Sequence, residues 1–198
     1  MACCSNLALL YKTTGKYEEA ISIYEPLEEL YMKTLGPYHK ATIILKHNLA
    51  ATYKSRGSPD LAIQLLSPLP PISSDSLQSY VLKASCFKDL NDLENAKLVI
   101  QEADEYITKT YGKGNVISVN LLNCKGLIHK NAKEFEDAEK CFKEALEIRL
   151  GMNGEKHPET IIIRHNLGEM YNAWGKKDQA EEYLMKNIQI MQDEIKNK

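Results

Sequence analysis

The chain has 198 residues, enough for one domain or two small ones. Its 25 Lys and Arg residues nearly balance 27 Asp and Glu residues, so the net charge is −2, and 43% of the residues are hydrophobic. These values exclude a nucleic-acid binder that relies on a bulk basic field, and they exclude a charge-rich disordered tail. No apolar run approaches the roughly 18 residues of a membrane-spanning helix, and the first residues lack the features of a signal peptide. We therefore expect a cytoplasmic protein without a membrane span.

The cysteines indicate reduced thiols. There are five of them, and none forms a Cys-x-x-Cys pair, which argues against a disulfide framework or a zinc knuckle. Adjacent N-terminal cysteines such as Cys3 and Cys4 can carry lipid. We favour the other interpretation, in which they are small apolar residues at the start of a helix.

Two distant segments of the chain follow almost the same pattern. Residues 39–53 and 157–171 both begin with His, contain His-Asn-Leu and end with Tyr, and in each an Ala follows the Tyr by nine residues. The start of the chain has the same spacing in Leu7, Ala8 and Tyr11, and two further copies are degenerate but in register. The alanines that mark the five copies are 42, 34, 42 and 42 residues apart: Ala20, Ala62, Ala96, Ala138 and Ala180.

This pattern resembles the tetratricopeptide repeat, which has a period of 34 residues and pairs two helices per repeat. The resemblance covers the whole chain and implies an all-α fold, a right-handed α-α superhelix of about ten antiparallel helices in one domain, 1–198. The five repeats are expected at about 1–36, 43–72, 77–112, 119–154 and 161–198. The 42-residue copies, with their Gly-containing loops before His-Asn-Leu helices, are similar to the long repeats of kinesin light chains.

Glycines and prolines predict where the helices end. The first helix of a repeat should end at a left-handed residue, and the second helix at a glycine 16 residues after the Ala anchor. We expect Pro158 to begin a helix and Pro26 to kink one. The prolines at 68, 70 and 71 should stop the second helix of repeat two, because a proline inside a helix removes a hydrogen bond and clashes with the preceding turn. The connector that follows is a candidate flexible joint, and its Ser or Asp residues should cap the next helix.

Helical spacing also predicts which residues face the concave groove of the superhelix. With the Ala anchor numbered 20 in each repeat, positions 2, 5, 6, 9, 12 and 13 lie opposite the packed stripe, and the candidates come from positions 5, 6 and 12. Four repeats carry Lys at position 12, and charge-assisted bonds from these lysines favour an acidic ligand, although exposed lysines are also common as plain surface charges. The candidate groove residues are Asn6, Lys12, His47, Asn48, Lys54, Lys88, Asn123, Lys130, His165 and Asn166.

The resemblance to kinesin light chains implies a non-catalytic scaffold of the cargo or adaptor type. In that family the position-6 asparagines hold the backbone of a partner peptide, which carries over to Asn6, Asn48 and Asn166, whereas Leu82 and Cys124 interrupt the series. We expect the partner to be a protein with an extended acidic segment, and the two proteins can belong to a larger complex. The kinesin light chain heptad region is missing, so the chain is either a short relative or the C-terminal part of a longer protein.

No catalytic motif, metal site or cofactor site is predicted. The histidine pairs recur because a helix was duplicated, and no Cys or carboxylate set has the spacing of metal ligands. We expect His129 and Trp174 to be packing residues. Repeat proteins that read RNA need a base-reading pair in every repeat, and positions 5 and 6 lack such a scheme. The alternative function is a mitochondrial assembly factor that resembles the tetratricopeptide protein of respiratory complex III, which would require an upstream transit peptide.

Overall fold

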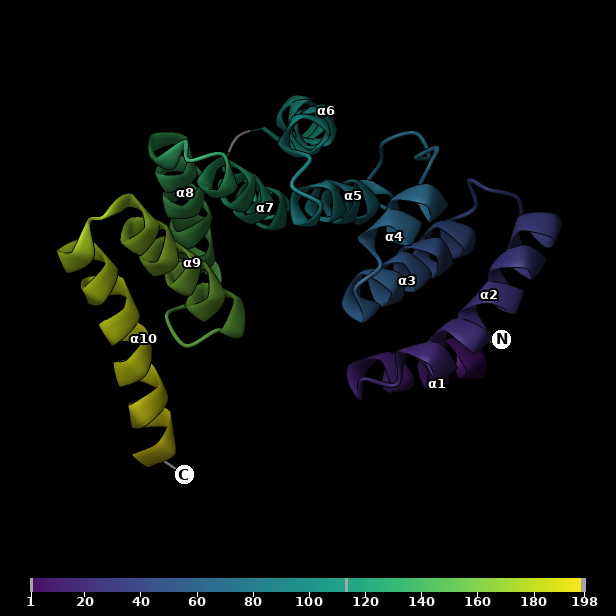
Figure 1. Cartoon of the computed structure of the whole chain (residues 1–198), viewed down its shortest axis with the longest axis horizontal. Helices are drawn as coiled ribbons and strands as arrows, with labels where there is room; N and C mark the ends of the chain where they lie inside the picture. Colours follow the sequence, from purple (N-terminus) through teal and green to yellow (C-terminus); the bar gives the residue numbers. More distant parts are fainter. Residues whose placement is uncertain (1, 113, 197–198) are drawn as a thin grey trace. The chain divides into compact units, whose positions relative to one another are not determined.

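The computed structural model describes residues 2–112 and 114–196, with side chains described for residues 4–112 and 114–193. Within these ranges the chain folds into ten α-helices and contains no β-strand. The helices belong to two compact units, residues 1–99 and 100–198, and α6 runs from the first unit into the second. Figure 1 shows each unit as successive helices joined by short loops. The all-helical class expected from the sequence is confirmed, and the prediction of one continuous domain stays a prediction.

Unit 1 holds the first two repeats and the start of the third. Its helices are α1 (Ala2–Thr13), α2 (Tyr17–Thr34), α3 (Lys40–Arg56), α4 (Pro59–Leu65), α5 (Leu77–Asp89) and the first residues of α6 (Leu93–Tyr111). The first helices α1 and α3 pack against their own second helices, α2 and α4, and α3 also contacts α2, α1 and α5. Unit 2 continues with α7 (Ser118–Asn131), α8 (Phe135–Asn153), α9 (Pro158–Trp174) and α10 (Lys177–Lys196), again packed as α7 with α8 and α9 with α10.

Left-handed residues end the first helices, as predicted. Gly57 and Gly175 are the C-caps of α3 and α9 with φ of 93° and 83°, and Asn91 replaces glycine after α5 with φ of 59°. A residue without a side chain adopts this conformation at no steric cost, and Asn tolerates it better than most. In the fourth repeat the same place is taken by Lys133, with φ of 60°, which the sequence did not indicate. The start of α9 at Pro158 is confirmed.

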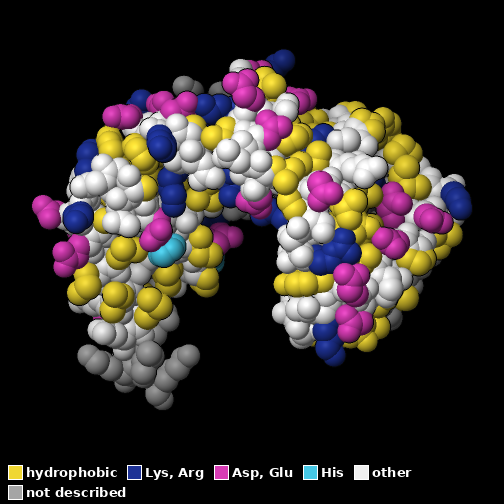
Figure 2. All heavy atoms as spheres, in the orientation of Figure 1, with side chains coloured by type: hydrophobic (Ala, Val, Ile, Leu, Met, Phe, Trp, Pro, Cys, Tyr) yellow, Lys and Arg dark blue, Asp and Glu magenta, His cyan; other side chains and the backbone are white. Residues whose placement is uncertain are grey.

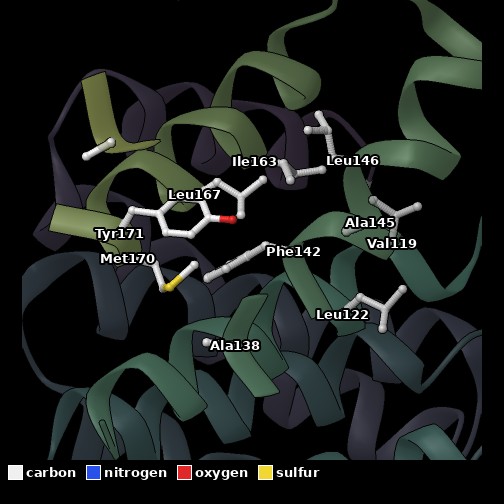
Figure 3. Packing of buried hydrophobic residues seen from close by; sticks show 11 residues of the cluster. Val119, Leu122, Ala138, Phe142, Ala145, Leu146, Ile163, Leu167, Met170 and Tyr171 are labelled. Atoms are coloured by element: carbon white, nitrogen blue, oxygen red, sulfur yellow. The ribbon is translucent and has the colours of Figure 1, made fainter. Parts of the chain in front are cut away.

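The two helices of a repeat approach closely because a small residue faces a large one. Ala8 and Ala50 are fully buried, and the repeats of unit 2 have Gly126 and Gly168 at the same position 8. A methyl group added to Gly126 would lie 2.7 Å from the ring of Phe142. Figure 3 shows Phe142 of α8 among its neighbours, with Leu167 and Met170 of α9 beside it, in the core cluster of unit 2. The packed stripe predicted from helical spacing is therefore the core.

The prolines shape the second and first repeats differently. Helix α4 has only 7 residues and ends at Leu65, whereas α2, α8 and α10 have 18, 19 and 20. The predicted stop before Pro68 is confirmed, while α2 continues through Pro26. After α4 the connector is closed by reciprocal hydrogen bonds between Ser73 and Ser76, in which each backbone N–H donates to the other residue's hydroxyl oxygen. Ser76 is the N-cap residue of α5, but its side chain makes no capping bond to that helix.

Candidate functional site

The ten candidate groove residues all lie on first helices, as their spacing requires. Unit 1 contains six of them on α1, α3 and α5, namely Asn6, Lys12, His47, Asn48, Lys54 and Lys88. Unit 2 contains the other four on α7 and α9, namely Asn123, Lys130, His165 and Asn166. Each unit therefore has its own set, which we call the first-helix face of unit 1 and the first-helix face of unit 2.

A carboxylate that the groove prediction overlooked joins two lysines on the first-helix face of unit 1. The amines of Lys54 and Lys88 lie 3.1 and 2.6 Å from the two oxygens of Asp89. Burial works to raise the pKa of this carboxyl, but the hydrogen bonds from the two lysines outweigh it and lower the pKa. Asp89 occupies position 13, next to the position-12 lysine and on the same helical face, so its place in the sequence was a usable signal.

Lys12 and His47 form a second polar group on this face. Burial lowers the pKa of the Lys12 amine. Burial, and then the charge of Lys12, also lower the pKa of the His47 imidazole. His47 is therefore neutral at pH 7, and its buried Nδ1 has no hydrogen-bond partner in the described part of the chain. A neutral imidazole can donate to or accept from a peptide backbone.

The position-6 series is uneven. Asn6 is exposed and Asn48 is half-buried, and neither amide makes a side-chain hydrogen bond within residues 4–112 and 114–193. Leu82 is half-buried, and Cys124 is only 5% exposed. An amide supplies both donors and acceptors for an extended peptide, whereas Leu and Cys supply almost none.

On the first-helix face of unit 2, two candidate asparagines bind each other. The amide of Asn166 on α9 donates to the Oδ1 of Asn123 on α7 at 2.8 Å. Beside them lies a small pocket of about 180 Å³, lined in part by Asn123 and Ile162. His165 is exposed and borders a shallow apolar hollow between α9 and α10, while Lys130 is half-buried.

Unit 2 also contains a polar cavity of about 440 Å³ that the sequence reading did not predict. It lies between the C-terminal half of α6, α7 and α8. On its wall, Lys125 donates to Asp104 at 2.5 Å and His129 lies 2.7 Å from Glu134. Burial tends to lower the pKa of Lys125, but its bond with Asp104 raises it overall. A signal existed, because these two residues occupy positions 7 and 11, where repeats one, two and five have Leu and Tyr.

His129 is thus not only a packed ring, as expected, but also a polar link at the edge of this cavity. Trp174 is a packing residue as predicted, since its ring stacks on Phe135 at 5.7 Å and Lys176 lies over it at 3.3 Å. Cys141 also lines the cavity, and burial raises the pKa of its thiol to about 11, so it is a protonated, unreactive thiol at pH 7.

The duplicated histidines at the helix starts have a structural function. The Nδ1 of His39 accepts from the backbone N–H of Ala41, and the Nδ1 of His157 accepts from that of Glu159. Each is the N-cap of its helix. Within the described ranges, no group of three or more His, Cys, Asp or Glu side chains is placed to hold a metal ion.

None of the cysteines with described side chains, Cys4, Cys86, Cys124 and Cys141, is in a disulfide, and Cys4 is exposed. Cys3 lies outside the described side chains. None of the described helices is both long and apolar enough to cross a membrane. On the face seen in Figure 2, acidic and basic side chains are interspersed among apolar ones and do not gather by sign.

Each unit consists of stacked pairs of antiparallel helices, and within a pair a small residue packs against a large one. This arrangement defines a helical-repeat protein, in which the first helices form the surface available to a partner. Models of the tetratricopeptide repeat match residues 1–67, 118–193 and 77–109. The chain belongs to the tetratricopeptide repeat family. Members of this family are typically protein-interaction modules and generally non-catalytic scaffolds. Comparison with curated proteins finds no match.

Solved structures share the fold at low sequence identity. A kinesin light chain-like protein of nearly identical TPR-like repeats from Podosopora anserina is 19% identical, with 98% of this chain and 96% of that chain covered and a TM-score of 0.78. BtubC from P. vanneervenii is 20% identical over 89% of this chain and 74% of that one, with a TM-score of 0.69. MamA is 20% identical over 96% of both chains, with a TM-score of 0.61. The resemblance to kinesin light chain repeats is confirmed at the level of fold.

Proposed function

We propose that the chain is a non-catalytic scaffold of the kinesin light chain-like adaptor type, and that the first-helix face of unit 1 binds an extended acidic segment of a protein partner. The observation that carries this proposal is the pair Lys54 and Lys88, which come from neighbouring repeats and converge on one carboxylate. The same two amines can hold a carboxylate of a partner, because Asp89 is one-third exposed and remains accessible from solvent.

The neighbouring residues suit the backbone of such a segment. Two lysines of this face, Lys54 and Lys88, share the carboxylate of Asp89, and Lys12 makes no ion pair within the described residues, so positive charge remains for a ligand. Asn48 and neutral His47 supply donors and acceptors between the lysines of α1 and α3. Asn123, Lys130, His165 and Asn166 belong to the same proposal as the first-helix face of unit 2. Affinity on the order of micromolar is expected for one extended peptide.

We also place the protein in the cytoplasm as part of this proposal. The alternative predicted from the sequence, an assembly factor of the respiratory complex III type, would use the same chemistry on these faces. The two are distinguished by the compartment in which the full-length protein is found, which imaging of the tagged protein measures.

The acidic-peptide proposal is tested by changing the charge of the face in both directions. Lys54→Glu should weaken binding of a fluorescein-labelled (Glu-Gly)4 peptide at least about fivefold, because one attraction is lost and one repulsion is added. Asp89→Asn should strengthen binding about twofold to fivefold, because it frees both amines. Asn48→Ala should weaken binding without a change of net charge. Fluorescence anisotropy at low and high salt measures all three.

The matched control is Lys33→Glu on the second helix α2, which changes the net charge equally at an exposed site. It should leave the affinity almost unchanged, and the thermal melts of Lys54→Glu and Asn48→Ala should stay close to that of the unmodified protein. An equal loss of affinity in Lys33→Glu would show that the effect comes from the net charge of the protein and not from this face. Unchanged binding in the double variant Asn48→Ala, Lys54→Glu contradicts the proposal.

A further inference from the structure

The early end of α4 leaves a pocket in unit 1. Where the other repeats continue their second helix, the chain turns into the proline connector and leaves a cavity of about 210 Å³. Its walls are mainly apolar and come from the end of α2, the loop after it, α3, and the connector: Met32, Tyr38, Ile43, Leu66, Pro68 and Pro70. Apolar walls hold water poorly, so burial of an apolar group in this pocket is favourable.

The duplicated repeats show what normally fills this space. Lys46 of α3 lines the pocket at position 4 of its repeat. The equivalent residue of repeat five, Arg164, is only 2% exposed and donates to Asn187 in the second half of α10 at 3.0 Å. In repeat four the equivalent Leu122 is 6% exposed in the core cluster with Leu146 of α8. In both repeats the continuing second helix covers position 4 with side chains, and in repeat two that half of the helix is missing.

Two polar groups of the pocket have side chains that are not paired with any other described group of the chain. Lys46 makes no ion pair within the described residues of the chain, although its neighbours Lys40 and Lys54 both do. Ser79 of α5 also lines the pocket, and it is 2% exposed. Its hydroxyl makes no hydrogen bond to any side chain or backbone group that the structure describes. The Ser79 hydroxyl oxygen is not one of the fully buried atoms that lack a partner, so it is open to the pocket and can bond either to water or to a bound ligand.

We propose that this pocket binds a bulky apolar side chain of a protein partner, with a carboxylate beside it that pairs with Lys46. The apolar walls bury the side chain, Ser79 donates to a polar atom of the bound segment, and the amine of Lys46 at the rim receives the acid. A polypeptide side chain is the occupant because side chains of a polypeptide helix occupy the equivalent space in repeats four and five.

The pocket is separate from the first-helix face. Its residues on α3 are at positions 1 and 4 of the repeat, whereas the face uses positions 5, 6 and 12, so the two sites can be tested independently. The variants Lys54→Glu and Asn48→Ala should leave the pocket unaffected. Failure of the acidic-peptide proposal would not remove this site.

The test is a titration followed by ¹H–¹⁵N NMR with two short peptides, acetyl-Gly-Leu-Glu-Gly-amide and acetyl-Gly-Leu-Gln-Gly-amide. The Glu peptide should shift the amide signals of Ile43, Lys46, Leu66 and Ser79, and it should bind about fivefold more tightly than the Gln peptide. The signal of Arg164, which is the equivalent of Lys46 in repeat five, should not move. Absence of shifts at millimolar peptide, or equal shifts around Arg164, overturns the proposal.

Two variants identify the contacts. Lys46→Gln should make the two peptides bind equally while the Gln peptide keeps its affinity. Ser79→Leu should fill the pocket and abolish both interactions, whereas Gln78→Leu, its exposed neighbour on α5, should not. If Ser79→Leu does not fold, as judged by circular dichroism, the ratio of the affinities for the Glu peptide and the Gln peptide, measured with Lys46→Gln, decides.

Other occupants give different results. If dodecanoate binds more tightly than the Glu peptide and shifts the same signals, the occupant of the pocket is an amphiphilic small molecule and not a peptide. Shifts of these signals that depend on protein concentration without added peptide would indicate a second copy of the chain. Either result overturns the proposal.

Discussion

Single residues in the duplicated segments behave differently although their sequences match. Thr42 and Thr160 are the same position of repeats two and five, and both are fully buried. The hydroxyl of Thr160 donates to the carbonyl of Gly154 at 2.9 Å, while the hydroxyl of Thr42 has no partner in the described structure. Identical residue types therefore contribute differently to stability, because only one of the two hydroxyls replaces the hydrogen bonds that it lost to water.

This difference predicts opposite effects of the same substitution. Thr160→Val should destabilise the protein by about 1 kcal/mol, because a buried hydrogen bond is lost and the carbonyl of Gly154 is left unpaired. Thr42→Val should be neutral or stabilise by up to about 1 kcal/mol, because it removes an unsatisfied hydroxyl. Urea denaturation followed by far-UV circular dichroism measures both. Equal destabilisation by the two substitutions would show that Thr42 is satisfied in solution.

At the scale of helices, the small residue at position 8 sets the distance between the two helices of a repeat. The sequence predicted this function, and the positions of Gly126 and Gly168 against Phe142 and Leu184 confirm it. Helix α4 is short because the prolines that follow the Ala anchor end the helix whatever surrounds it. His129 and Lys125 make a polar interface because side chains at positions 7 and 11 point toward the neighbouring helices.

The close approach predicts that Gly126→Ala destabilises unit 2 by about 1–3 kcal/mol, because the new methyl group would overlap the buried ring of Phe142. This is the net effect: the overlap outweighs the roughly 1 kcal/mol that alanine normally gains over glycine inside a helix. Gly151 of α8 is the matched control, since a methyl group there meets nothing within 4 Å. Gly151→Ala should stabilise by about 0.5–1 kcal/mol. Thermal melts compare the two, and a stabilising Gly126→Ala would contradict the packing.

At the scale of the whole molecule, the helix contacts described within each unit join helices one or two places apart along the chain. Such a chain has no central core, and its stability is a sum of local terms. Function follows the same principle, because each unit presents its own set of first-helix residues.

Neighbour-only packing predicts that thermal unfolding is not a single two-state transition. Differential scanning calorimetry should give a calorimetric enthalpy greater than the van't Hoff enthalpy. Gly126→Ala should lower the transition of unit 2 and leave that of unit 1 in place. One transition with equal enthalpies, shifted as a whole by Gly126→Ala, would show that the two units unfold cooperatively.

The sequence by itself determined the repeat register, the helices, their left-handed ends and the early stop of α4. These depend on local preferences, such as the helical period, the conformational freedom of glycine and the missing N–H of proline, and local preferences are written in short stretches of residues. It also placed the ten candidate residues on first helices and missed Lys133 and Asp89.

Only the tertiary structure decided which of those residues meet. The pairing of Lys54 with Asp89, of Asn166 with Asn123 and of Lys125 with Asp104 joins residues 35, 43 and 21 positions apart. A side chain finds its partner across the space between two packed helices, so the outcome depends on helix separation and burial. The pocket beside Lys46 has the same origin: the prolines stop a helix locally, but the cavity exists because the neighbouring helices stay in place around the missing half.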